Sequence, residues 1–193
     1  MNLSISGGSI EHYIEQIAHS LVEAFLALDI LRGLRVAAQA PTFFTQFACA
    51  HDAINRVAFD SLFIRVGRVI DTSADTFTFP GLITHFRKEW IDDSSRTLAL
   101  DEVSLAFACV REDTLGKLTR WRNKVIAHRT NKVGNLIFYE ANKLSIDEVE
   151  TALVSIQNLF NDLCESANNS THDCTSASLR LQGEVQQLFG LEG

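Results

Sequence analysis

Residues 9–39, SIEHYIEQIAHSLVEAFLALDILRGLRVAAQ, decide the fold class of this chain. Apolar side chains recur there at intervals of three and four residues, which is the spacing of one face of an α-helix. The members of this series are Ile10, Tyr13, Ile14, Ile17, Leu21, Phe25 and Leu28. Because Ser9 is a suitable N-cap and Pro41 cannot continue a helix, we expect one long helix from Ser9 to about Gln39.

The same periodicity continues beyond Pro41 and predicts a second long helix over residues 42–71. A helix of that length reaches roughly 45 Å at about 1.5 Å per residue. Since only a short connection separates the two long helices, we expect them to form an antiparallel hairpin.

The rest of the chain also has helical patterns, separated by polar stretches. A short helix is expected at residues 80–90, followed by a turn at residues 92–95. Beyond the turn we expect helices at residues 101–129 and 145–167, and a last helix that ends near Phe189. Ser145 and Glu148 have the spacing of a capping box, which supports the helix start at that point. A bend is expected near Asp113 or Gly116.

These patterns together predict an all-α protein, a bundle of five to six helices that contains a long antiparallel hairpin. Residues 1–167 would form one helical domain. Residues 168–193 would form a polar linker and an amphipathic helix that packs on the same domain or on a partner. The composition agrees, since 46% hydrophobic and 21% charged residues in a chain of 193 are typical of one globular core.

Several classes of protein are excluded or disfavoured. A net charge of −7 argues against a protein that coats nucleic acid without specificity. The first Lys or Arg is Arg32 and the apolar runs are interrupted by charges, so we expect no export signal or membrane span, and a cytoplasmic location. The scattered cysteines and histidines predict no metal site, and the glycines match no nucleotide-binding loop, so no cofactor is expected.

One segment of this acidic chain is strongly basic. Six of the seventeen Lys and Arg lie in residues 117–132, and no Asp or Glu occurs between Thr114 and Tyr139. A local cationic patch attracts polyanions whatever the total charge. We therefore expect RNA as a ligand, bound by Lys117, Arg120, Lys124, Arg129 and Lys132.

The same segment contains the groups needed to cut RNA without a metal. RNA carries its own nucleophile, the 2′-hydroxyl group, so an enzyme needs only proton transfer and stabilisation of charge. His128 could transfer protons near neutral pH, and the forked guanidinium of Arg122 could bind the phosphate as its charge increases. The amide of Asn123 could orient either group.

A structural explanation of the same residues stays open. On a helical wheel Arg122 falls inside the apolar sector, so it must be paired, or face a groove or a partner subunit, because an unpaired buried charge is very costly. A salt bridge to an acid on the long hairpin would suffice. His128 falls at the edge of that sector, so Arg122 and His128 converge only if the helix ends or bends, or if two copies face each other. Basic residues near a helix C-terminus are also favoured by the helix dipole.

Two stretches resemble a known family. The sequence RNKVIAH at residues 122–128 resembles the signature of the HEPN superfamily, an arginine followed by a histidine after four to six residues. With Arg129 it is similar to the form found in the abortive-infection, AbiU-like branch. Residues 61–71, SLFIRVGRVID, and 77–82, FTFPGL, are similar to a second region of that branch. With the Ser145 helix start, the resemblance covers residues 40–165 in order.

This resemblance implies an all-α domain that commonly forms a homodimer in which two Arg–His motifs line one cleft. Catalytic members are metal-independent endoribonucleases, often toxins or phage-defence effectors, and a partner antitoxin or defence protein would then be expected. Arg122, Asn123 and His128 would carry the chemistry. Some members have a tyrosine that an antitoxin adenylylates, and Thr130 stands there instead.

Two hypotheses follow. The first is an HEPN-type ribonuclease, and the alternative is a non-catalytic helical module that binds RNA, a nucleotide or a partner protein. Arg68 and Asp71 lie three residues apart on one helix face and either support the site or form a surface pair. Five phenylalanines of the hairpin are interpreted as packing, in part a dimer contact, and not as a base-stacking surface: Phe43, Phe44, Phe47, Phe59 and Phe63.

Overall fold

The computed structural model describes residues 10–39, 43–72, 77–123 and 143–167. Within these ranges the regular structure is entirely helical, which confirms the all-α prediction. The helices are α1 (Ile10–Ala37), α2 (Phe43–Ile70), α3 (Phe79–Glu89), α4 (Ser94–Val110), the π-helix η1 (Arg111–Leu115), α5 (Gly116–Trp121) and α7 (Ile146–Ser166). No described helix combines the length and the apolar character that a membrane crossing requires.

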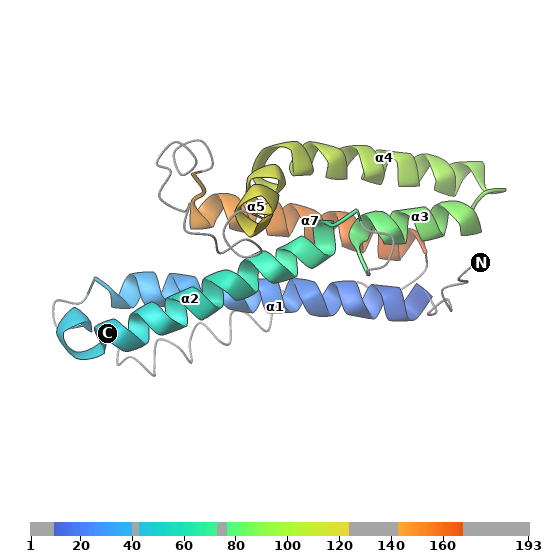
Figure 1. Ribbon diagram of the computed structural model, residues 1–193. Coiled ribbons are helices and arrows are strands. Elements are labelled where there is room, and N and C mark those ends of the chain that lie inside the picture. The colour runs from blue at the N-terminus through green and yellow to red at the C-terminus, as the bar shows by residue number, and fades with distance from the viewer. Residues whose placement is uncertain (1–9, 40–42, 73–76, 124–142, 168–193) are drawn as a thin grey trace, which may run out of the picture.

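The long hairpin predicted from the periodicity is confirmed. α1 and α2 each have 28 residues and run antiparallel side by side over much of their length, as Figure 1 shows. Ile17 and Leu21 of α1 and Val66 of α2 are 0% exposed. Burial of such branched side chains typically contributes about 1.5–3 kcal/mol each, so this apolar face holds the hairpin together.

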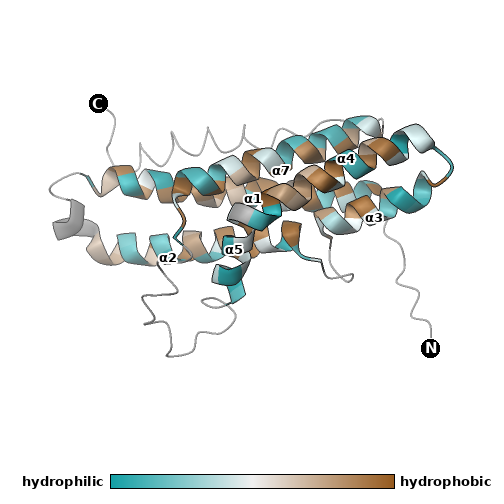
Figure 2. Ribbon diagram, turned by 90° about the horizontal axis from the view of Figure 1, so that it is seen from above, coloured by the Kyte–Doolittle hydropathy of each residue, from teal (hydrophilic) through white to brown (hydrophobic). Residues whose placement is uncertain are grey.

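A second layer of helices covers one side of the hairpin. α4 and α7 run antiparallel to each other above α1, and α3 closes one end of the bundle (Figure 1). Figure 2 shows apolar residues gathered where these helices meet in the middle of the bundle. The layer is held by fully buried side chains such as Leu100 of α4 and Ile156 and Phe160 of α7.

The start of α4 corrects one prediction. Residues 92–95 were expected to form a turn, with helix resuming at Asp101, but α4 already begins at Ser94. The cause is Asp93, whose Oδ1 accepts hydrogen bonds of 3.1 Å from the backbone N–H groups of Ser95 and Arg96. A carboxylate in this N-cap position satisfies donors that the first turn leaves unpaired, so the polar run starts the helix.

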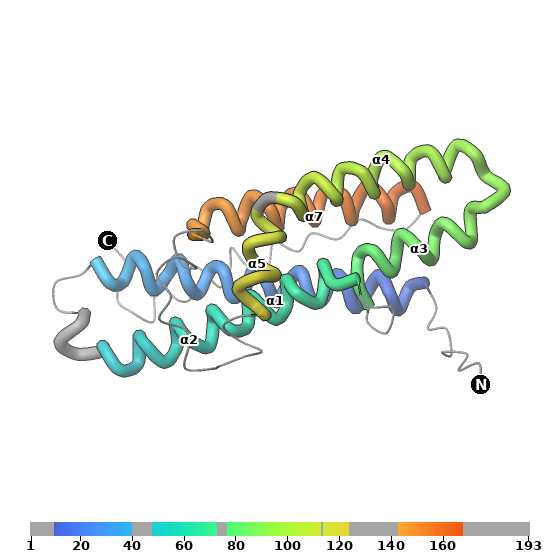
Figure 3. Tube along the Cα trace, turned by 45° about the horizontal axis from the view of Figure 1, so that its top comes forward, coloured from blue at the N-terminus to red at the C-terminus, as the bar shows by residue number. Residues whose placement is uncertain are grey.

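The predicted bend is present and changes the direction of the chain. α4 ends in the π-helix η1, and α5 then leaves the axis of α4 and crosses toward α2, as Figure 3 shows. Gly116 lies at the turn, where a Cβ atom would be only 3.1 Å from the carbonyl oxygen of Arg111. Because of this bend, Arg122 lies beside the hairpin.

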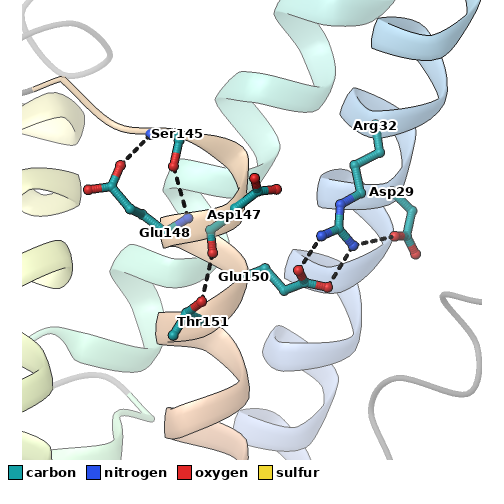
Figure 4. A network of polar contacts seen from close by, with 7 residues as sticks. All are labelled: Asp29, Arg32, Ser145, Asp147, Glu148, Glu150 and Thr151. Carbon is teal, nitrogen blue, oxygen red and sulfur yellow. Dashed lines mark hydrogen bonds and ion pairs between the residues drawn. The ribbon is translucent and has the colours of Figure 1, made fainter.

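A polar network joins the two layers. Arg32 of α1 donates hydrogen bonds through both terminal nitrogens to the carboxylate of Glu150 in α7. Asp29, only 3% exposed, lies on the other side of the same guanidinium, with Oδ1 3.9 Å from Nη1 (Figure 4). The raised pKa of Arg32, caused mainly by its hydrogen bond to Glu150, keeps this pairing charged. Arg32 therefore compensates a nearly buried carboxylate and fixes α7 against α1.

The predicted capping box at the start of α7 is confirmed. The Ser145 hydroxyl accepts from the backbone N–H of Glu148 at 3.1 Å, and the Glu148 carboxylate accepts from the backbone N–H of Ser145 at 2.6 Å (Figure 4). Lys117 of α5 lies 3.5 Å from the same carboxylate. Glu148 thus both caps α7 and connects it to α5.

Acid is expected to weaken this cap. The hydrogen bond from the backbone of Ser145 lowers the pKa of Glu148 below its ordinary value of about 4.5. A carboxylate whose pKa is lower in the folded state than in the unfolded state stabilises the fold when the pH is above the unfolded pKa. This contribution is lost as the pH falls below about 4.5. We expect Glu148→Gln to reduce the loss of thermal stability between pH 6 and pH 3, measured by circular dichroism. An identical loss in the wild type and the variant would contradict this assignment.

Candidate functional site

Arg122 lies at the C-terminal end of α5, directly over a glycine of α2. A Cβ atom placed on Gly67 would be 2.6 Å from Cδ and 2.8 Å from Nη1 of Arg122. Non-bonded carbon atoms pack at about 3.5–4.0 Å, so any side chain at position 67 would collide with the arginine. The absent side chain of Gly67 is therefore what lets Arg122 lie flat against the hairpin.

Two polar contacts fix the guanidinium in this position. Nη1 of Arg122 donates to Oδ2 of Asp71 at 3.3 Å, and Nε donates to Oδ1 of Asn123 at 3.1 Å. Arg122 is thus paired, as its place in the apolar sector requires, and the acid comes from the end of the hairpin. The side chains of Arg122 and Asp71 remain 26% and 35% exposed, so the pair contributes little to stability and acts mainly on orientation.

The other residues predicted for the site lie in different places. Lys117 faces α7 and its Glu148 partner, while Arg120 is exposed and lines a separate hollow between α3, α4 and α5. Arg68 is exposed on α2, one residue from Gly67. The remaining predicted residues lie outside the described residues: Lys124, His128, Arg129 and Lys132. Among the described residues, the structure brings together Arg122, Asn123 and Asp71.

A pocket is lined in part by Trp121, the residue that precedes Arg122 in the chain, and we call it the aromatic pocket. It has a volume of about 490 Å³ and lies between α1, α2, α5 and the start of α7. Most of its lining is apolar, and three aromatic rings form part of the wall. The lining residues used below are Arg35, His51, Asn55, Phe59, Phe63 and Trp121.

Gly67 and the aromatic pocket were not predicted from the sequence. The signal for Gly67 was available, because an isolated glycine inside a helical pattern costs about 1 kcal/mol relative to alanine and often marks a close approach of another group. The pocket had no comparable signal, since its lining comes from four separate segments of the chain.

A metal site is not evident in the part of the chain that the structure describes. No group of three or more His, Cys, Asp or Glu side chains is placed there to hold an ion. Cys49 and Cys109 are exposed thiols, and Cys164 is buried. The charged groups of the described site are therefore the guanidinium of Arg122 and the carboxylate of Asp71.

Replacing Gly67 with alanine is expected to separate stability from activity. Alanine is favoured over glycine inside a helix by about 1 kcal/mol, so thermal stability should stay equal or rise slightly. The new methyl group would push the Arg122 side chain away from Asp71, and we expect about a tenfold loss of any RNA cleavage, since small misplacements of a catalytic group are costly.

A double-mutant cycle tests whether the effect passes through Arg122. In an Arg122→Ala background, Gly67→Ala should have no further effect on cleavage. An equal effect in both backgrounds would show that Gly67 acts by another route.

No curated protein and no solved structure matches the chain. The family model HEPN_AbiU2, described as AbiU2, matches residues 18–188, well over half of the chain, and this range includes both stretches that meet at Arg122. With an all-helical fold and a match of this extent, the chain belongs to the AbiU2 family of HEPN proteins.

Proposed function

We propose that this protein is a metal-independent endoribonuclease of the HEPN type that acts in phage defence or as a toxin. One observation supports the proposal most directly. Arg122, the first residue of the Arg–His motif, is positioned by Gly67 and Asp71, which belong to the other stretch that resembles this family. The guanidinium of the motif is thus held in one orientation by residues from the second stretch.

The proposed mechanism uses the 2′-hydroxyl group of RNA as the nucleophile. A base removes its proton, the oxygen attacks the adjacent phosphorus, and the 5′-oxygen leaves with a proton, which produces a 2′,3′-cyclic phosphate. His128 serves as the general acid or base. Nε of Arg122 donates to Asn123 and Nη1 donates to Asp71. Arg122 stabilises the charge on the phosphate with the N–H groups of its third nitrogen, Nη2.

The proposal includes an assembly and partners. A homodimer would place two Arg–His motifs along one cleft, and Lys124, Arg129 and Lys132 would attract the RNA backbone together with Lys117 and Arg120. An antitoxin or another defence protein would control the activity.

The ion pair itself also favours the alternative, a non-catalytic module. Asp71 offsets part of the positive charge of Arg122, and an arginine that pairs with an acid on the hairpin needs no further role. In that case the basic segment would dock RNA, a nucleotide or a partner protein without cleaving it.

Incubation of the purified full chain with total RNA in EDTA distinguishes the two. The nuclease predicts cleavage that survives chelation and yields fragments ending in 2′,3′-cyclic phosphate. The alternative predicts that RNA is bound and recovered intact, and that result would overturn the nuclease proposal.

A further inference from the structure

One ridge of α2 connects the aromatic pocket with Arg122. Its members follow one another at intervals of four residues: His51, Asn55, Phe59, Phe63, Gly67 and Asp71. Each member of such a ridge lies about 6 Å further along the axis and about 40° further round the helix than the one before, so successive members are neighbours. The first four line the pocket, and the last two position Arg122. Phe63 of the pocket and Gly67 beneath Arg122 are successive members of this ridge, and Trp121 of the pocket wall directly precedes Arg122 in the chain.

The wall nearest Arg122 is made of aromatic rings. Phe59 lies 4.4 Å from Phe63 and 6.1 Å from Trp121 between ring centroids, and Phe63 lies 6.2 Å from Trp121. Phe63 is only 4% exposed, in agreement with its interpretation as packing. Phe59 and Trp121 are partly exposed and line the pocket, so packing alone does not describe them.

The rim of the pocket carries polar groups. Asn55 is exposed, His51 is partly exposed, and Arg35 is exposed on α1. An amide and an imidazole match the hydrogen-bonding edge of a base, and the guanidinium group of Arg35 complements a phosphate of the same strand. The apolar wall suits a flat ring, and a volume of about 490 Å³ lies within the range of small-ligand sites.

We propose that the aromatic pocket receives one unpaired nucleobase of an RNA strand, next to the phosphate that Arg122 binds. The proposal rests on the proposed function for the identity of that phosphate. It assigns the substrate class as single-stranded RNA, because bases inside a duplex are stacked and paired and cannot enter. Stacking of a base on an aromatic side chain typically strengthens binding about 5- to 150-fold.

The fluorescence of Trp121 offers a direct test. The probe is a single-stranded 2′-O-methyl oligoribonucleotide, which lacks the nucleophile and so cannot be cleaved. We expect this strand to quench tryptophan emission in the full-length protein. A duplex of the same strand, and an abasic strand of the same length, should quench at least tenfold more weakly. Trp90 is 5% exposed in the core and provides a constant background.

Variants on α2 locate the binding site. Phe59→Leu should raise the Kd for the single strand about tenfold, while Val57→Ala, at a 69% exposed position outside the pocket, should leave it unchanged. Asn55→Ala, on the exposed rim, should reduce the differences in Kd among strands of the four bases. Because Asn55 is exposed, its variant remains informative even if Phe59→Leu fails to fold.

The outcomes separate this proposal from the nuclease. Equal quenching by the abasic strand and the single strand would overturn the pocket proposal. So would a wild-type Kd in Phe59→Leu together with wild-type differences among the four bases in Asn55→Ala. If RNA is cleaved and the abasic strand binds as well as the single strand, the nuclease proposal stands and the pocket proposal is rejected. If quenching depends on the bases but no RNA is cleaved, the pocket proposal stands and the nuclease proposal is rejected.

Discussion

Replacing His128 with alanine is expected to slow RNA cleavage by about 10²–10⁴-fold, the usual contribution of one general acid or base. The imidazole is the proposed proton carrier, and an ordinary imidazole pKa of about 6.5 suits both directions of transfer at neutral pH. The measurement is the initial rate of cleavage of a labelled RNA in EDTA. The rate of the wild type should change with pH near neutrality, and the residual rate of the variant should not.

His19→Ala is the matched control for this substitution. His19 belongs to α1, its side chain is 67% exposed, and it lies 3.5 Å from Glu23. Its replacement removes an imidazole from the surface of the same domain without approaching the site. Cleavage by a correctly folded His128→Ala protein at the wild-type rate would eliminate the proposed mechanism.

Replacing Arg122 with lysine is expected to lower the cleavage rate by about 10²–10³-fold, as the loss of one preorganised donor does in other enzymes. Lysine keeps the charge and can still approach Asp71, so the fold should survive. It loses the planar fork that binds Asp71 and a phosphate at the same time. The effect should therefore appear in the rate of single-turnover cleavage, with little change in thermal stability.

Arg56→Lys provides the control for this second substitution. Arg56 lies on α2 and forms an exposed ion pair with Asp52 at 3.0 Å. Arg56→Lys therefore makes the same substitution in an ion pair outside the proposed site. Asp71→Asn adds a contrast, because it keeps an oxygen acceptor beside Arg122 and removes the negative charge. If Arg122 is only structural, Arg122→Lys and Asp71→Asn should both leave RNA cleavage at the wild-type rate.

Much of the fold could be predicted because it is determined by local patterns. The apolar spacing in α1 and α2, and the capping box at Ser145 and Glu148, are all contained within a few turns of sequence. The start of α4 was misplaced because Asp93 and the serines after it are equally common in turns and in N-caps. Only the hydrogen bonds from Ser95 and Arg96 decide between the two.

The site could be predicted only in part, since its geometry depends on contacts between distant residues. The position of Arg122 on the helical wheel indicated that it needs a partner, and Asp71 was named as a supporting residue. That Asp71 is this partner could not be derived, because 51 positions separate the two and the bend at η1 decides where α5 points. The aromatic pocket escaped prediction for the same reason.

The four-residue spacing along α2 constrains how this gene can change in length. Inserting or deleting one codon between Phe63 and Asp71 would rotate everything beyond it by about 100° and shift it by about 1.5 Å. The carboxylate, and for a change before position 67 also the glycine, would then leave Arg122 while the pocket stayed in place. Related genes should therefore keep this interval free of insertions and deletions, and should tolerate them in the connection between α2 and α3.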